Sequence, residues 1–186
     1  MRTAGPPNHL VYVWSLRVRL FHWALATSVA GAWLLSEDVR WLHEYSGYAA
    51  VALVVVRILF GFFGTGYERF ANFVRGPSAT LAYLGDIARR RERRHLGHNP
   101  AGGIMIVGLL CTIALIALTG WMMTTDTFWG DERVEAIHKL LANGLVVLVI
   151  LHVTGVLVAS LSHRENLVRA MITGWKRPNP DDERSH

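Results

Sequence analysis

Four stretches of the chain are apolar over about 20 residues each, and shorter polar segments separate them. They cover residues 16–35, 42–63, 101–123 and 134–160. A helix of about 20 residues crosses the ~30 Å hydrocarbon layer of a bilayer, so each stretch is long enough to span it. Helices also satisfy their backbone hydrogen bonds internally, which lipid requires. The pattern predicts an all-α membrane protein, a four-helix bundle forming a single domain over 1–186, with a polar tail at 178–186.

The long connection between the second and third stretches predicts a helix on the membrane surface over 78–94. Leu81, Leu84 and Ile87 recur every three residues, and Ser78 can cap the start of the helix. A run of arginines follows this apolar stripe. We interpret the segment as an interfacial connector in a long cytoplasmic loop, in preference to a device that binds a partner.

Composition excludes several other classes of protein. Of the 186 residues, 52% are hydrophobic and only 18% are charged, and the mean hydropathy is +0.27. This balance disfavours a disordered chain or an ordinary cytosolic domain. Cys111 is the single cysteine, so an intramolecular disulfide, a cysteine-rich metal site and a CxxCH motif for covalent haem attachment are all excluded.

The positive charge is distributed unevenly between the two sides of the predicted membrane. Fifteen basic residues lie near the start of the first stretch, in the second loop or after the fourth stretch. The first and third loops carry only Arg40 and Arg133. Those two loops hold the acidic residues Glu37, Asp38, Asp126, Asp131 and Glu132. Cytoplasmic loops retain positive charge, so we predict a multi-pass membrane protein with both termini cytoplasmic. The net charge of +5 is then explained by the orientation of the protein in the membrane and by attraction to lipid headgroups, so we expect no nucleic acid as a partner.

Four of the nine histidines, His22, His43, His138 and His152, lie within the apolar stretches or at their ends. A histidine at membrane depth is costly unless it binds a neighbour or a metal. For one such residue alone, a hydrogen bond to a carbonyl would be the simpler explanation. His138 and His152, however, are 14 residues apart, which returns to within about 40° of the same side of a helix and separates them by about 21 Å. One helix therefore presents two stacked sites.

The other two histidines lie at matching depths, which predicts the pairs His22 with His152 and His43 with His138. Two imidazoles without a thiolate or carboxylate suit haem iron better than tetrahedral zinc, which takes four protein ligands. The histidines at positions 9, 95, 98, 163 and 186 lie outside the stretches or at their margins. We therefore expect His95 and His98 to be dispensable for haem binding.

Other residues near these histidines suit a flat macrocycle. Gly47, Gly144 and Gly155 lie close to the predicted ligands and provide space, although close helix packing explains them equally well. Arg57 lies 14 residues beyond His43, near the predicted inner site. We interpret it as a counter-ion to a haem propionate, with a snorkelling arginine as the alternative. Arg17 and Arg19 can help in the same way.

Several motifs as a set resemble the bacterial cytochrome b561 family, which includes the cytochrome b subunits of nickel–iron hydrogenases. The matching stretches begin with Arg17-Val18-Arg19-Leu20-Phe21-His22-Trp23 and end with Ala170-Met171-Ile172-Thr173-Gly174, and between them lie His43 to Gly47, Arg57-Ile58-Leu59-Phe60-Gly61, Gly97-His98-Asn99-Pro100, Leu118-Thr119-Gly120-Trp121, His138-Lys139 and Leu151-His152-Val153-Thr154-Gly155-Val156. The resemblance implies four transmembrane helices in the bacterial cytoplasmic (inner) membrane and two b haems on His22, His43, His138 and His152. It also implies electron exchange between a quinone pool and a redox partner.

The function we predict is transmembrane electron transfer between a membrane quinone and a periplasmic cytochrome c or oxidoreductase subunit, with a bound quinone as a further cofactor beside two haem b. The chain would be an electron carrier and not a stand-alone catalyst. Alternatives are a membrane-anchoring cytochrome b subunit of a hydrogenase or reductase, a superoxide:quinone oxidoreductase, and, without redox chemistry, a metal transporter or assembly protein. Residues able to relay quinone protons are Glu44, Lys139, His163 and Glu165. The acidic outer loops would steer a basic partner.

Overall fold

The computed structural model describes residues 10–35, 39–89, 91–92 and 94–178. Several predictions fall outside these described residues. They concern Arg2, His9, the acidic residues Glu37 and Asp38, Arg90, Arg93, Arg184, His186 and the part of the polar tail beyond Pro178.

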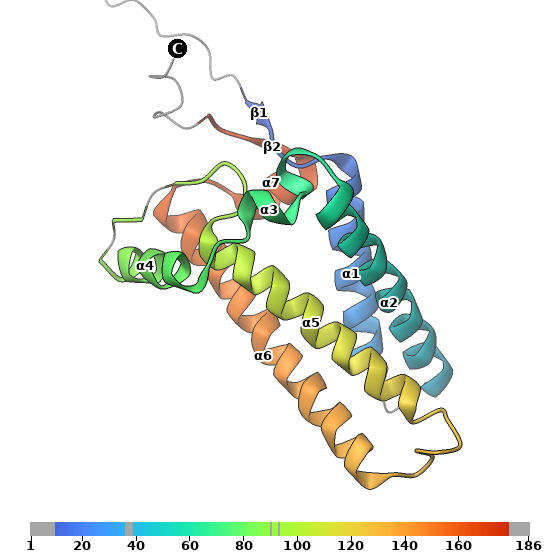
Figure 1. Ribbon diagram of the computed structural model, residues 1–186. Coiled ribbons are helices and arrows are strands. Elements are labelled where there is room, and N and C mark those ends of the chain that lie inside the picture. Colours follow the sequence, from blue (N-terminus) through green and yellow to red (C-terminus); the bar gives the residue numbers. More distant parts are fainter. Residues whose placement is uncertain (1–9, 36–38, 90, 93, 179–186) are drawn as a thin grey trace, which may run out of the picture.

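Four long helices form the body of the molecule (Figure 1). They are α1 (Leu16–Leu34), α2 (Arg40–Phe63), α5 (Pro100–Met122) and α6 (Glu132–Ser162). Each begins and ends within two residues of a predicted stretch. Side-chain caps set three of the starts, because Ser15, Asn99 and Asp131 accept hydrogen bonds from the first turns of α1, α5 and α6. In the described part of the chain the only strands are two residues long, so the protein is essentially all helical.

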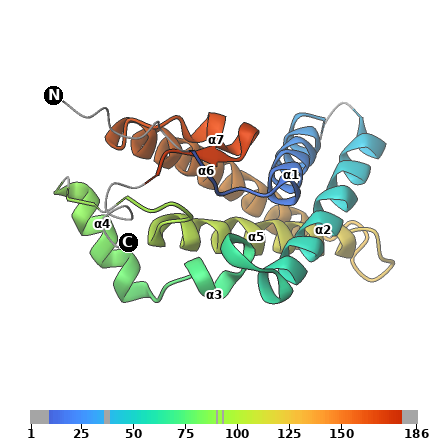
Figure 2. The same ribbon diagram turned by 90° about the horizontal axis from the view of Figure 1, so that it is seen from above.

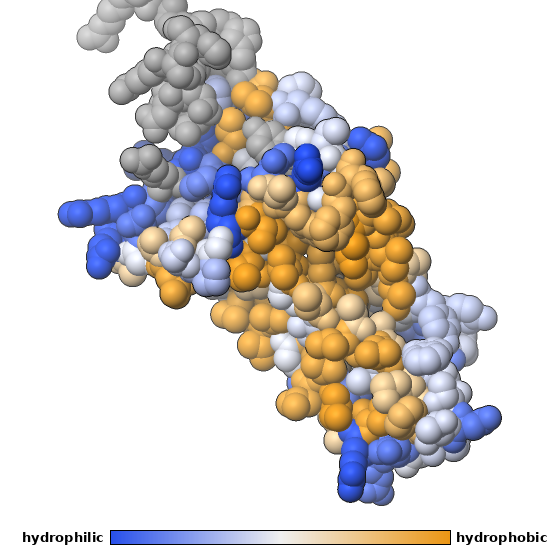
Figure 3. Space-filling model, viewed as in Figure 1, coloured by the Kyte–Doolittle hydropathy of each residue, from blue (hydrophilic) through white to orange (hydrophobic). Residues whose placement is uncertain are grey.

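Three of these helices, α2, α5 and α6, are long and apolar enough to cross a membrane by length and composition. The prediction of four such spans is therefore met for three. The first stretch does form α1, but Arg17, Arg19 and His22 occupy its first two turns, which shortens its apolar part. Figure 3 shows a broad apolar band on one face of the molecule, between polar ends.

The helices pack in the order α1 against α2, α2 against α5, and α5 against α6. A central cluster of buried residues joins three of them: Ala50 and Val54 of α2, Leu110 and Ile113 of α5, and Leu145 of α6. Phe21, Leu25 and Val29 of α1 pack against this cluster. The core therefore lies halfway along the long helices.

Short elements gather at one end of the long helices (Figures 1 and 2). They are the strands β1 (Val11–Tyr12) and β2 (Trp175–Lys176), the 3-10 turn η1 (Gly66–Glu68), and the helices α3 (Phe70–Phe73), α4 (Pro77–Ala88) and α7 (Leu167–Thr173). The strands are antiparallel, with Val11 opposite Lys176. Segments near the two ends of the chain therefore lie side by side, and we call this the strand end of the molecule.

Helix α4 corrects the predicted surface helix in two respects. Its N-cap is Gly76 and Pro77 occupies its first turn, so Ser78 lies inside the helix and is not the cap. A proline favours the first helical position because its missing N–H is not needed there. The helix also ends at Ala88 and not at residue 94, because like charges one turn apart in the following arginine run oppose helix continuation.

The exposed face of α4 is apolar. Leu81 and Leu84 of the predicted stripe are exposed, whereas Thr80 and Tyr83 are buried against the rest of the protein. An outward-facing apolar stripe suits a helix that lies in the membrane interface.

Candidate functional site

The long helices bring four histidines together as two pairs, and within each pair the two imidazole rings lie close to each other. The rings of His22 on α1 and His152 on α6 have centroids 6.4 Å apart, with an interplanar angle of 46°. The rings of His43 on α2 and His138 on α6 have centroids 6.2 Å apart, at 73°. All four residues are partly buried. These are the two pairs predicted from depth; we call them the inner pair (His22 and His152) and the outer pair (His43 and His138).

The spacing within each pair fits one iron atom. Two metal–nitrogen bonds of about 2.0 Å, with about 1.15 Å from each ring centre to its nitrogen, place two centroids about 6.3 Å apart. Among the described residues, no three His, Cys, Asp or Glu side chains come together as a metal site. A pair of imidazoles alone leaves a tetrahedral metal short of ligands, whereas a porphyrin supplies four nitrogens of its own. The donor set therefore fits haem b.

In the outer pair, both histidines are held through Nδ1. Nδ1 of His43 lies 2.7 Å from the carbonyl oxygen of Ala32, to which it can only donate. Nδ1 of His138 lies 2.9 Å from Oγ1 of Thr119 on α5. That hydroxyl donates its own proton within α5, to the carbonyl of Ile116 or Leu115, so it accepts from His138. Both histidines thus keep Nε2 available to ligate a metal, since a hydrogen bond at one ring nitrogen fixes the tautomer.

Gly120, next to Thr119, makes room for the His138 ring. A Cβ atom at this position would lie 3.3 Å from Cε1 of His138. The Thr119-Gly120 pair therefore both orients and accommodates one ligand candidate. The motif that contains these residues did not predict this role, because a Thr-Gly pair in the last turn of an apolar helix carries no chemical signal by itself.

The inner pair is surrounded differently. Nδ1 of His22 is buried and has no hydrogen-bond partner among the described residues. The neighbouring Trp23 ring meets it edge-on, with centroids 5.2 Å apart. Two contacts tie this turn of α1 to α7: Arg19 donates to the carbonyl of Ile172, and Nε1 of Trp23 donates to that of Met171 at 3.4 Å. The inner pair therefore lies close to the strand end.

The predicted glycines lie in uncrowded positions. A Cβ atom added to Gly47, Gly144 or Gly155 would meet no atom of the described protein within 4 Å. That space accommodates a planar group, and their part in binding one remains a prediction.

Arg57 is buried and is only 6% exposed. Its Nη1 donates to the carbonyl oxygen of Glu68 at 3.0 Å, and its guanidinium lies over the rings of Phe70 and Phe73, 4.8 and 5.7 Å from their centroids. Glu68 accepts from the Ser15 hydroxyl at 2.5 Å and lies 3.8 Å from Arg17. Arg57 thus has protein partners on one side, which does not fit a side chain that reaches out to water. Its pairing with a propionate remains a prediction.

His98, outside the predicted site, lies among aromatic side chains near the strand end. Its ring centroid is 4.6 Å from that of Trp14 and 4.7 Å from that of Phe73. Burial and the nearby positive charges of Arg57 and Lys176 lower the pKa of His98 to about 3, with smaller effects of His152 and His22. His98 is therefore neutral at pH 7. Its loop position gave no helical period from which to predict this placement.

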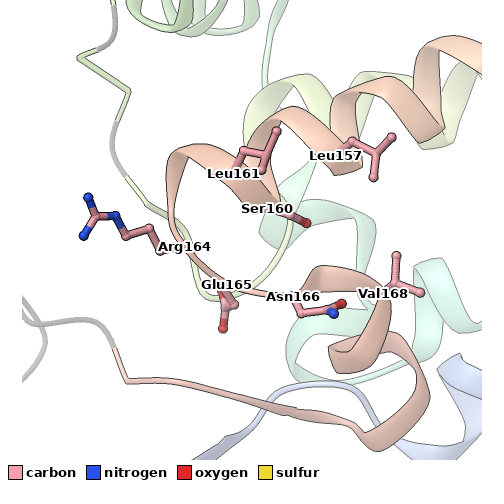
Figure 4. Close-up of a pocket in the computed structure, with 7 residues that line it drawn as sticks. All are labelled: Leu157, Ser160, Leu161, Arg164, Glu165, Asn166 and Val168. Atoms are coloured by element: carbon pink, nitrogen blue, oxygen red, sulfur yellow. The ribbon is translucent and has the colours of Figure 1, made fainter.

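The residues proposed for proton relay divide between the two ends. Glu44 pairs with Arg40 at 2.9 Å and Lys139 with Glu135 at 2.5 Å, both exposed. At the strand end, Glu165 pairs with Arg94 at 3.0 Å and lies 3.8 Å from Lys176. Glu165 also borders a pocket of about 370 Å³ between α6 and α7 (Figure 4), lined by Leu157, Ser160, Leu161, Arg164, Glu165, Asn166 and Val168. His163 ends α6 nearby.

These features define a helical membrane protein with two stacked histidine pairs suited to haem. Comparison with known proteins agrees: the prokaryotic cytochrome b561 family matches residues 13–174, and the chain belongs to this family. Membership makes it an integral-membrane cytochrome b of electron transfer, with b-type haem as its cofactor.

Curated relatives cover nearly the whole chain at low identity. A probable Ni/Fe-hydrogenase B-type cytochrome subunit of Bradyrhizobium diazoefficiens is 21% identical over 95% of this chain and 89% of its own length. Proteins of the same description from Rhodobacter capsulatus (20% identical; 89% of this chain and 81% of their own) and Azotobacter vinelandii (22% identical; 89% and 88%) are also similar. No solved structure matches the chain significantly.

Proposed function

We propose that this protein carries electrons across the bacterial cytoplasmic membrane through two bis-histidine b haems. The observation that supports this most strongly is the distance between ring centroids within the two histidine pairs, 6.4 and 6.2 Å. One histidine of each pair, His152 or His138, lies on the same helix, α6. His22 and His152 would hold the inner haem, and His43 and His138 the outer one. Haem b supplies one-electron chemistry at its iron.

The chain's own residues would limit that chemistry to electron transfer. His22 with His152, and His43 with His138, would both ligate the iron of the haem at their site, which disfavours binding of oxygen. Between the pairs, the central cluster around Leu145 excludes water, since Leu145 lies seven residues from His138 and from His152 on α6. Electrons would therefore cross between the two sites within an apolar interior.

We further propose that α1 is a fourth span and that the strand end is cytoplasmic. The basic loops support this orientation through the positive-inside rule. The outer site would then face the periplasm, where Asp126, Asp131 and Glu132 would attract a basic partner such as a cytochrome c. A membrane quinone would exchange electrons at the inner site, with Glu165 and His163 as candidate proton carriers.

A second candidate function is that of a cytochrome b subunit within a larger enzyme complex. The relatives named as probable hydrogenase cytochrome subunits favour it. The two candidates differ in the redox partner at the outer site. In the first it is a cytochrome that binds transiently, and in the second it is an enzyme subunit that stays bound. Electron-transfer rates with a cationic cytochrome that fall steeply with added salt support the first candidate; co-purification of a stable redox enzyme with salt-insensitive transfer supports the second.

The haem content of the purified protein tests the proposal. We expect a b-type reduced-minus-oxidised spectrum and two haems per chain. His152→Ala and His138→Ala should each remove one haem, whereas His163→Ala, a matched change at the end of the same helix, should remove none. A colourless protein would instead support a metal transporter or assembly protein, and haem content unchanged in both ligand variants would refute the pairing.

A further inference from the structure

Several buried polar atoms near the inner pair have no hydrogen-bond partner among the described residues. They are Nε of Arg19, Nδ1 of His22, Oε2 of Glu68 and Nδ1 of His98. Buried polar atoms are nearly always paired, so such a group of atoms calls for an explanation. In contrast, the histidines of the outer pair both have Nδ1 partners within the protein.

Contacts connect these atoms into one region. Arg57 donates to the Glu68 backbone and lies over Phe73, and the Phe73 ring in turn packs on His98. The charges of His22, His152 and Arg57 all act on His98. His98, on the loop before α5, is therefore close enough to the inner pair for their charges to interact.

The surroundings of His98 favour an anion. Arg57 and Lys176 are the cations whose charges act on it. The two carboxylates of this region already have partners: Glu68 accepts from the Ser15 hydroxyl and lies 3.8 Å from Arg17, and Glu165 pairs with Arg94 and lies 3.8 Å from Lys176. An imidazole carries at least one N–H in either protonation state, so it can donate to an anion whatever its charge.

We propose that His98 donates a hydrogen bond to a propionate of the haem held by His22 and His152, with Arg57 as the neighbouring positive charge. His98 is then a positioning residue for the inner haem: it is not an iron ligand but, unlike the expectation from the sequence, it contributes to holding that haem. The inference rests on the proposed inner haem. It also explains why a ring with two nitrogens lies between the aromatic rings of Trp14 and Phe73.

Two substitutions separate this role from simple packing. His98→Phe keeps a ring between Trp14 and Phe73 but removes both nitrogens, whereas His98→Gln keeps a donor but loses the ring. A propionate with less hydrogen bonding carries more effective negative charge, which stabilises the oxidised iron. We therefore expect His98→Phe to lower the inner-haem midpoint potential, by about tenfold in the reduction equilibrium or about 59 mV for one electron. His98→Gln should stay within about threefold of the parent.

Potentiometric titration with haem quantification is the measurement, and His95→Phe is the control. His95 lies in the same loop, with its ring 5.5 Å from that of Tyr83, and its replacement should leave both potentials unchanged. Loss of the inner haem in His98→Phe but not in His98→Gln also supports the proposal. Unchanged potentials in His98→Phe, damage confined to His98→Gln, or equal loss in both variants would overturn it.

The parent protein distinguishes failure of this inference from failure of the proposed function. If the parent binds two haems and His98→Phe leaves both potentials in place, only the role of His98 is wrong. If the parent lacks the inner haem, the pairing of His22 with His152 is itself wrong.

Discussion

At the scale of single residues, the outer pair is defined as much by what holds its rings as by the rings themselves. Hydrogen bonds from Nδ1 to Ala32 and Thr119 fix which nitrogen of His43 and His138 is left for ligation. The histidines and their spacing could be predicted from the sequence because a helix repeats every 3.6 residues. The partners of Nδ1 could not, because they come from other helices.

Replacing Thr119 tests this support. Thr119→Val keeps the shape of the side chain but removes the hydroxyl that accepts from His138. Loss of such a supporting hydrogen bond typically costs about 10- to 100-fold in metal affinity, so we expect weaker binding of the outer haem and no change in the inner one. Haem titration of the apoprotein, followed through each haem's absorbance, measures this effect. Thr119→Ser retains the hydroxyl and should bind like the parent; a valine variant equal to the serine variant would contradict the assignment.

At the scale of elements, hydropathy predicted the long helices well and the short ones poorly. A span of about 20 apolar residues is determined by the membrane and needs no knowledge of neighbours. The short elements depend on tertiary contacts: a Cβ atom on Gly103 would lie 2.6 Å from the carbonyl oxygen of Phe73, so α3 packs directly on the backbone of α5. The position of His98 follows from the same packing, through Phe73. No periodic pattern of apolar residues in the sequence predicts such contacts.

The loop before α5 is attached to β2 by a buried ionic cluster around Glu165. Its carboxylate pairs with Arg94 and Lys176, and the Lys176 side chain, only 4% exposed, also donates to the carbonyl of Leu96 at 2.9 Å. Burial lowers the pKa of Lys176, while the Glu165 carboxylate opposes that shift. The cluster therefore couples the C-terminal strand to the segment that carries His98.

Glu165→Gln should loosen this attachment. Removing one partner leaves buried cations uncompensated, which typically costs about 3–5 kcal/mol. We expect a clearly lower thermal unfolding midpoint in detergent and faster proteolysis at the 91–98 loop. The matched control is Glu135→Gln, which breaks an exposed pair with Lys139 and should leave the unfolding midpoint almost unchanged, because solvent screens such pairs. Equal effects of the two substitutions would show that the Glu165 cluster does not stabilise this end.

At the scale of the whole molecule, the two histidine pairs lie toward opposite ends of α6, while both described ends of the chain lie together at the strand end. An even number of membrane crossings is required to bring the two ends to one side. Three helices qualify as spans by composition, so α1 must supply the fourth crossing if the body of the protein is embedded. The pairing of β1 with β2 therefore supports α1 as a fourth crossing, although α1 does not qualify by hydropathy alone.

Cysteine labelling tests this topology and its orientation together. Cys111 is exposed on α5, so the background protein carries Cys111→Ser. On it, Leu10→Cys and Arg177→Cys probe the two ends of the chain, and Thr127→Cys probes the loop between α5 and α6. In spheroplasts, a membrane-impermeant maleimide should label only the Thr127→Cys protein if, as proposed, the basic loops place the strand end in the cytoplasm. All three should react after lysis, which controls for accessibility. Labelling of one chain end but not the other would exclude four crossings, whereas labelling of both ends and not residue 127 would keep four crossings and reverse the direction in which the two sites face.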